Sequence, residues 1–222
     1  MDFSEKYHED DFPQQYAAKH EESFSRRLND AREKSLLARS LGLAGNPDKV
    51  MDVGCGPGRF WPTIAGTGVK TFTALDVSVP MVRFALAHNQ ALSCSPFGMV
   101  GSVLALPLGD DSADCVIAMR LLHHFGTARE RLQALRELSR VAWRHVIISV
   151  WVDGNYKSWR RNRLEVSRST RKYQNRHVVN REEFERHFKA LNLKVIGCFD
   201  LVPFYSQWRY YVLEKPSAKL NP

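Results

Sequence analysis

Cysteines and long apolar runs are both scarce in this sequence. The 222 residues include only four cysteines, which are far apart and form no Cys-x-x-Cys or His/Cys pattern. A disulfide framework and a zinc site are therefore both unexpected, and the cysteines are interpreted as reduced thiols. No apolar run approaches the roughly 18 residues that a bilayer span needs, so no transmembrane segment is predicted.

The N-terminus lacks the features of a secretion signal. Met1 to Phe12 is polar and acidic, with no basic stretch leading into an apolar one, and a cytoplasmic location is the resulting expectation. Hydrophobic residues make up 44% and charged residues 25% of the chain, which is typical of a globular protein rather than a disordered one. At this length we expect one α/β domain with a buried core.

Acidic residues are too few to balance the basic ones, and the formal net charge is +8. Much of the excess lies between Trp159 and Arg176, where only Glu165 is acidic. The cations of this stretch are Arg160, Arg161, Arg163, Arg168, Arg171, Lys172 and Arg176. Such a concentration would attract nucleic acid, phosphate or an anionic lipid surface. A solvated helix face is an equally good interpretation.

The first 43 residues have helical character. Between Ser23 and Leu43, apolar residues recur at helical spacing among charges and without a proline. Tyr7, Phe12 and Tyr16 precede this stretch in a polar arm that is placed to fold over a pocket. We predict an N-terminal helical cap over residues 1–43 and a second unit over residues 44–222. Within that unit, residues 151–180 form a basic insertion that contacts an acceptor or a partner.

Short apolar strands then alternate with helices. Gly45, Asn46 and Pro47 end the first helix. Strands are predicted at Lys49–Val53, Lys70–Asp76, Gly98–Ser102, Ala113–Met119 and His145–Val150. Helices are predicted near Arg59–Thr67, Met81–Leu92, Arg129–Val141 and Arg181–Leu191. This alternation predicts a mostly parallel sheet with right-handed crossovers.

Two further strands follow the last helix. Leu193–Leu201 and Gln207–Lys215 are separated by a short turn at Pro203, which is too short for a helical crossover. They are therefore expected to pair antiparallel. The predicted fold is α/β: a doubly wound, seven-stranded, mostly parallel sheet with an antiparallel C-terminal hairpin and the helical cap.

The strongest motif is a glycine-rich turn after the first strand. In Val50-Met-Asp-Val-Gly-Cys-Gly-Pro-Gly-Arg59, the glycines let the backbone approach a ligand at the carboxyl edge of the sheet, where doubly wound folds bind nucleotides. The spacing is GxGxG rather than the GxGxxG of a dinucleotide site, and the absence of a GKS/T excludes a P-loop. Asp52 places a negative charge before the loop, which suits an ammonium or sulfonium ligand.

A second acidic residue ends the next strand. Asp76 follows Asp52 by 24 residues, which is about the offset at which an acid meets a ribose diol. Its two oxygens can accept hydrogen bonds from both hydroxyls of the diol. Met81 follows at a position that suits packing on an adenine face.

These segments resemble the S-adenosylmethionine-binding motifs of class I (Rossmann-like) methyltransferases. The resemblance is close from Lys49 to Val150 and looser from His177 to Lys215. It implies a methyltransferase with S-adenosylmethionine as cofactor, S-adenosylhomocysteine as product and no metal ion. The cofactor-binding residues that we assign on this basis are Asp52, Gly54, Cys55, Gly56, Gly58, Asp76, Val77, Met81, Ser102, Val103, Met119 and Arg120.

Two details refine the implied site. Ser102 stands where the family often has an aspartate for the adenine amino group, so adenine is expected to depend on the Val103 backbone and on packing. The segment Met119-Arg-Leu-Leu-His-His-Phe125 follows the fourth strand, where cofactor and acceptor meet in the family. His123 or His124 is a candidate general base near neutral pH, and a structural role is the alternative for either. Cys55 is interpreted as a packing residue rather than a nucleophile.

Three functions fit the sequence. The first is methyl transfer to a small-molecule or lipid-precursor acceptor, contacted by the cap, the His123/His124 loop and the insertion. The second is modification of tRNA, because the segment from His123 to Trp151 is similar to tRNA wobble-uridine carboxymethyl methyltransferases. The arginines of 159–176 would then meet the phosphate backbone, with Tyr173 and Trp159 for stacking. The third is a non-catalytic partner protein that binds the cofactor.

Five aromatic residues near the carboxyl edge of the predicted sheet either line an acceptor pocket or close the core. They are Trp151, Trp159, Phe204, Tyr205 and Trp208.

Overall fold

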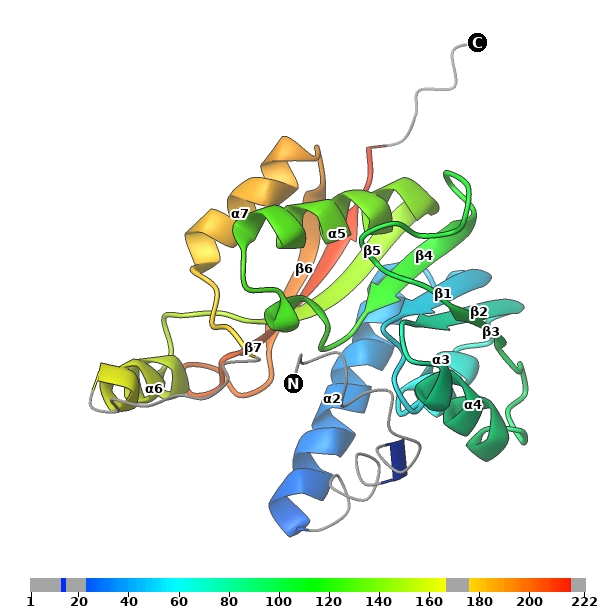
Figure 1. The fold of residues 1–222 in the computed structure, drawn as a ribbon, viewed down its shortest axis with the longest axis horizontal. Helices are drawn as coiled ribbons and strands as arrows, with labels where there is room; N and C mark the ends of the chain where they lie inside the picture. Colours follow the sequence, from blue (N-terminus) through cyan, green and yellow to red (C-terminus); the bar gives the residue numbers. More distant parts are fainter. Residues whose placement is uncertain (1–12, 15–22, 167–175, 217–222) are drawn as a thin grey trace.

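Seven strands form one sheet with helices on both of its faces (Figure 1). The computed structural model describes residues 13–14, 23–166 and 176–216. The strands are β1 (Lys49–Val53), β2 (Thr71–Asp76), β3 (Phe97–Val100), β4 (Ala113–Ala118), β5 (Ala142–Trp151), β6 (Lys194–Asp200) and β7 (Trp208–Glu214). Each predicted strand is therefore present, with ends that shift by a few residues.

The strand order is β3-β2-β1-β4-β5-β7-β6. β1 to β5 pair in parallel, whereas β7 runs antiparallel to both β5 and β6, which confirms the predicted C-terminal hairpin. The order reverses between β1 and β4, because β2 lies on one side of β1 and β4 on the other. A crevice is expected outside the carboxyl ends of the strands at such a reversal.

Helices cover the two faces unequally (Figure 1). They are α2 (Phe24–Leu43), α3 (Trp61–Ala65), α4 (Val79–His88), α5 (Ala128–Val141), α6 (Tyr156–Val166) and α7 (Arg181–Ala190), with a 3-10 turn, η2 (Leu122–His124). α5 and α7 bury apolar side chains on one face, and α2, α3 and α4 on the other. Neighbouring residues of β4 alternate between these two cores: Val116 faces the first and Ile117 the second, as the period of a strand requires.

The predicted cap helix is part of the second core. α2 begins at Ser23, whose side chain accepts a hydrogen bond from the Arg26 backbone N–H. Leu37 and Leu41 are fully buried in the same cluster as Trp61 and Val50. The predicted boundary at residue 43 thus separates a helix and a sheet that share one hydrophobic core.

Some elements depart from the sequence prediction. The basic insertion contains a helix, α6, where the sequence left a solvated helix face as one of two interpretations, and the strand predicted to reach Ser102 ends at Val100. The predictions for Arg168, Arg171, Lys172 and Tyr173 lie outside the described residues, as do those for Tyr7, Phe12 and Tyr16.

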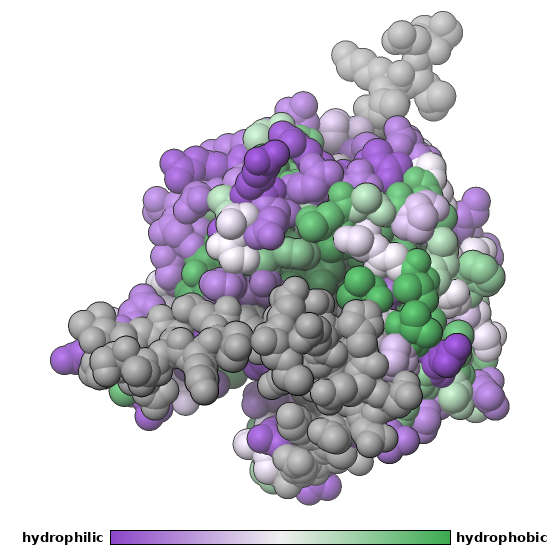
Figure 2. All heavy atoms as spheres, viewed as in Figure 1, coloured by the Kyte–Doolittle hydropathy of each residue, from purple (hydrophilic) through white to green (hydrophobic). Residues whose placement is uncertain are grey.

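The surface of the face shown in Figure 2 is divided by chemistry. Hydrophilic side chains cover the outer sides of α5 and α7, and apolar side chains gather nearer β1 to β4. Among the described residues, no helix is both long enough and apolar enough to span a membrane.

Candidate functional site

A cleft of about 310 Å³ lies at the carboxyl ends of β1, β2 and β4, at the point where the strand order reverses. Its walls carry most of the side chains that the sequence assigned to the cofactor. These are Gly54, Cys55, Gly56, Asp76, Val77, Met81, Ser102, Val103, Met119 and Arg120. Asp52 and Gly58, also assigned to the cofactor, are buried and do not line the cleft.

The glycine loop needs residues without side chains for two different reasons. Gly54 and Gly56 have φ angles of +70° and +53°, which L-residues rarely adopt. A Cβ on Gly54 would lie 3.0 Å from the Leu121 side chain, which would have to shift to make room for it. A Cβ on Gly56 would meet nothing within 4 Å, because this residue borders the open space of the cleft.

Asp76 connects the glycine loop to the end of β2. One carboxylate oxygen accepts from the Gly56 backbone N–H at 2.8 Å, and the other accepts from the Ser78 N–H at 2.9 Å. Burial raises the pKa of Asp76, and hydrogen bonds from the backbone N–H groups of Ser78, Gly56 and Val77 oppose that rise. The carboxylate lines the cleft, and its two oxygens have about four lone-pair sites, so a site remains for a hydroxyl donor from a ligand.

Asp52 is buried behind the loop. It is only 1% exposed and accepts a hydrogen bond from Trp61 Nε1 at 3.2 Å. Burial raises the pKa of this carboxyl to about 7; the Trp61 bond opposes the rise and the neighbouring Asp76 adds to it. Direct contact of Asp52 with a cofactor stays a prediction, because it is not part of the cleft wall.

Two other side chains of the wall have local roles. Ser102 Oγ accepts from the Leu104 backbone N–H at 3.2 Å, which holds the turn after β3. Burial raises the pKa of the Cys55 thiol well above its usual value, so the protonated, non-nucleophilic form prevails.

The two candidate histidines occupy different places. His124 lines the cleft, whereas His123 lies beneath it, 1% exposed, with its ring centroid 5.0 Å from Trp151 and 4.8 Å from Trp208. Burial lowers the pKa of His123 well below its usual value, and the neighbouring His124 and Arg120 lower it further. His123 is therefore neutral at physiological pH.

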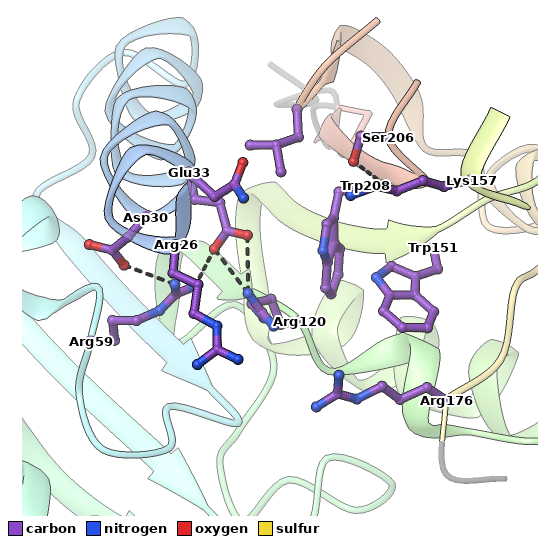
Figure 3. A pocket seen from close by; sticks show the side chains of 12 residues that line it. Arg26, Asp30, Glu33, Arg59, Arg120, Trp151, Lys157, Arg176, Ser206 and Trp208 are labelled. Atoms are coloured by element: carbon purple, nitrogen blue, oxygen red, sulfur yellow. Dashed lines mark hydrogen bonds and ion pairs between the residues drawn. The ribbon is translucent and has the colours of Figure 1, made fainter. Parts of the chain in front are cut away.

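A second cavity, of about 300 Å³, adjoins the cleft (Figure 3). α2 contributes Arg26, Asp30 and Glu33 to its wall, and the opposite side carries Trp151, Lys157, Arg176 and Trp208. Arg59 and Arg120 line both spaces. The two cavities therefore meet at this pair of arginines.

A buried carboxylate holds the two shared arginines. Glu33 is 2% exposed and accepts from Arg59 Nη2 and from Arg120 Nη1, the latter at 3.1 Å. Asp30 accepts from Arg59 Nη1 at 2.9 Å. The Arg120 guanidinium also lies 4.7 Å from the ring centre of Trp208. Arg120 has a φ of +59°, in the strained region where functional residues cluster.

The structure divides the aromatic set that sequence patterns left undecided. Trp151 and Trp208 are buried, at 7% and 8% exposure, and line the second cavity. Trp159, Phe204 and Tyr205 are exposed at the surface. Two of the five aromatic residues therefore form part of a pocket wall, and the other three lie on the surface.

Sequence reasoning missed most residues of the second cavity. Arg26, Glu33 and Arg59 belong to no motif of their own, although the cap and the insertion were expected to supply acceptor contacts. Arg59 ends the glycine-rich segment, so its position beside that loop is the one local signal that could have identified it.

Comparisons with known proteins agree with this geometry. Residues 51–148 match the sequence family described as Methyltransferase domain. The human "Probable tRNA methyltransferase 9B" is 32% identical over 92 residues, which are 41% of this chain and 18% of that protein. The Arabidopsis thaliana "tRNA (carboxymethyluridine(34)-5-O)-methyltransferase" is 28% identical over 104 residues, 46% of this chain and 24% of that protein. The chain thus spans about a fifth of the length of these curated relatives.

A solved structure matches over a larger part of the chain. Magnesium protoporphyrin IX methyltransferase from Synechocystis PCC 6803, crystallised with bound SAH, superposes with a TM-score of 0.72 and 16% identity, and the match covers 87% of this chain and 88% of that one. At this identity the likeness shows the fold. The sequence match thus concerns residues 51–148, and over most of its length the chain shares the fold of this solved methyltransferase.

Proposed function

We propose that the protein transfers a methyl group from S-adenosylmethionine to a small-molecule or lipid-precursor acceptor. One observation carries the proposal: the glycine-lined cleft opens beside a second cavity, and Arg59 and Arg120 line both. Two adjoining cavities of this kind can hold a methyl donor and an acceptor at the same time.

The cleft fits the cofactor. Gly56 leaves open space where the backbone of the loop meets a ligand, which suits the methionine part of S-adenosylmethionine. Asp76 offers two oxygens to the ribose diol. The apolar side chains of Met81 and Val103 suit the adenine ring, in keeping with a serine rather than an aspartate at position 102.

The chemistry needs positioning more than covalent catalysis. S-adenosylmethionine supplies a methyl group on a positively charged sulfur, which is transferred by in-line displacement. The protein must align an acceptor with that group and exclude water. Where the acceptor gives up a proton, we assign the receiving base to His124, which lines the cleft, and a packing role against Trp151 and Trp208 to the buried His123.

Transfer to tRNA is the second candidate function. It is favoured by the similarity to tRNA methyltransferases over 92 and 104 residues of the chain. Arg160 and Arg163 on α6 are exposed, and the Arg163 guanidinium lies 5.0 Å from the exposed Trp159 ring. Cations beside an exposed indole suit a phosphate backbone with unstacked bases.

A cytoplasmic location fits the thiol chemistry. All four cysteines, Cys55, Cys94, Cys115 and Cys198, are free, which suits a reducing compartment.

Calorimetric titration with S-adenosylhomocysteine tests the cofactor site. Asp76→Ala is expected to weaken binding by about 10- to 150-fold, because charge-assisted hydrogen bonds are worth about 1.5 to 3 kcal/mol each. Asp48→Ala is the matched control, since Asp48 is exposed and pairs only with Lys70 among the described residues. Equal affinities of the wild type and Asp76→Ala would remove the ribose assignment.

Transfer of radiolabelled methyl from S-adenosylmethionine to fractionated extract of a strain lacking the protein then identifies the acceptor class. Label in the small-molecule or lipid fraction supports the first function, and label in tRNA supports the second. Cofactor binding without label in any fraction favours a non-catalytic partner protein.

A further inference from the structure

We infer that the second cavity binds a small acceptor with a flat, unsaturated ring and a negatively charged group, either a carboxylate or a phosphate. This inference rests on the proposed function, because it treats the second cavity as the acceptor site. Three properties of the cavity support it: the distribution of charge, the aromatic wall and the size.

The charge of the cavity is unevenly distributed. Its wall contains five cationic residues and two acidic ones. Both acids, Asp30 and Glu33, contact Arg59, and Glu33 also holds Arg120. The end that adjoins the cofactor cleft is therefore close to neutral.

Two further cations, Lys157 and Arg176, lie on the side of the cavity opposite α2. Among the described residues, Lys157 and Arg176 contact no carboxylate, and both lie against aromatic rings instead. Figure 3 shows Arg176 on the Trp151 side of the cavity, away from α2. Because no described carboxylate neutralises Lys157 or Arg176, a bound anion would supply the missing opposite charge on this side of the cavity. The negative group of the acceptor is thus expected beside these two cations.

The aromatic wall supplies a surface for a ring. Trp151 and Trp208 lie 5.4 Å apart between ring centroids with their planes at 72°, and both border the cavity. Trp151 Nε1 is buried and has no hydrogen-bond partner among the described residues. A buried donor without a partner is costly, so an acceptor oxygen reaching this nitrogen would gain a hydrogen bond that the protein itself leaves unmade.

The size of the cavity favours a small molecule. A volume of about 300 Å³ lies at the lower end of the range for small-molecule sites, roughly 300 to 1,000 Å³. It suits one or two fused rings with a short acidic side chain.

Isothermal titration of the full chain with S-adenosylhomocysteine present tests the inference. The probes are matched pairs: indole-3-acetate against indole-3-acetamide, and phenyl phosphate against phenol, at fixed ionic strength. We expect at least one acid to bind about tenfold or more tightly than its neutral counterpart, because only the acid supplies the charge opposite to that of Lys157 and Arg176. A preference for indole-3-acetate over its amide would indicate that the cavity binds a carboxylate. A preference for phenyl phosphate over phenol would indicate that it binds a phosphate.

Two arginine variants locate the effect. Arg176→Gln is expected to abolish the preference for the acid, whereas Arg160→Gln, which changes an exposed arginine of α6 outside the cavity wall, is expected to retain it. Affinity for S-adenosylhomocysteine is measured for both variants. If the wild-type protein does not bind S-adenosylhomocysteine, the proposed function is refuted. If it binds S-adenosylhomocysteine but shows no preference for an acid, only the present inference fails.

Three results would overturn the inference. The first is equal binding of acid and neutral probe throughout the panel. The second is an equal effect of the two arginine variants. The third is binding of an anticodon stem-loop RNA, weakened by Arg160→Gln, with no binding of any small acid; this result would favour the tRNA function.

Discussion

At the scale of single residues, the glycine loop combines backbone strain with open space. Gly56 and Gly45 both have positive φ angles, +53° and +79°, and a Cβ on either would meet no atom within 4 Å. They differ in place, because Gly56 borders the cofactor cleft and Gly45 follows the C-terminus of α2. Substitutions at Gly45 and Gly56 should therefore share the cost in folding free energy of a strained backbone. Only a substitution at Gly56 should also take up space beside a ligand.

Alanine at these two positions should give different binding but similar stability. Each substitution is expected to cost about 1 to 2 kcal/mol of folding free energy, since the left-handed conformation is strained for residues with a Cβ. Only Gly56→Ala should also weaken S-adenosylhomocysteine binding, about tenfold, because its methyl group enters the cleft. Urea unfolding and calorimetry measure the two effects. Unchanged binding by Gly56→Ala would show that the cofactor does not approach this residue.

Asp52 makes stability depend on pH. Its pKa is about 7 in the folded protein and 3.8 ordinarily, so between these values the folded state holds more protons than the unfolded state. The free energy of unfolding therefore falls as pH rises through this window, by on the order of 4 kcal/mol in total.

Asp52→Asn should remove this component, since the amide does not ionise and can still accept the Trp61 hydrogen bond. Urea unfolding of the wild type and the variant between about pH 4.5 and pH 7.5 measures the difference. Saturating S-adenosylmethionine should reduce the wild-type slope, because a cationic ligand near Asp52 favours its ionised form. Parallel stability curves for the two proteins would contradict the raised pKa.

At the scale of elements, α2 has one buried side and one exposed side. Leu37 is fully buried, whereas Leu28 on the same helix is 61% exposed. Leu37→Ala is expected to cost about 2 to 5 kcal/mol through lost burial and the cavity left behind. Leu28→Ala should stay within about 0.5 kcal/mol of the wild type. Chemical unfolding measures both; a small loss for Leu37→Ala would mean that α2 is not part of the domain core.

Elements were predictable where one local pattern determines them. Alternating apolar strands and helices located all seven strands, and the short turn at Pro203 gave the antiparallel hairpin. For α6 a helix remained one of two interpretations, because Tyr156 to Val166 contains one lysine and three arginines, a concentration of charge that also suits an anion-binding segment. α4 begins at Val79, two residues before the predicted start, since the Ser78 side chain caps the helix and Pro80 suits its first turn.

At the scale of the whole molecule, the cofactor cleft was predictable and the second cavity was not. The cleft is built from continuous motifs at the ends of neighbouring strands, so spacing along the chain reveals it. The second cavity combines α2, the loop after β1, the segment after β4 and the region around β5 to β7. Arg59 and Arg120 lie 26 and 87 residues from Glu33, and no local pattern reports a contact over such separations.

Glu33 joins these distant parts, so its charge should matter more than that of its neighbour Asp30. Glu33→Gln is expected to cost about 3 kcal/mol, because it leaves the largely buried Arg59 and Arg120 without their shared carboxylate. Asp30→Asn, one turn away on α2 and more exposed, should cost about 1 kcal/mol or less. Urea unfolding compares the two variants. Because the arginines border both cavities, Glu33→Gln should also weaken S-adenosylhomocysteine binding more than Asp30→Asn does. Equal losses of stability would show that the ion pairs of Glu33 contribute no more to stability than that of Asp30, so that Glu33 has no special role in fixing Arg59 and Arg120.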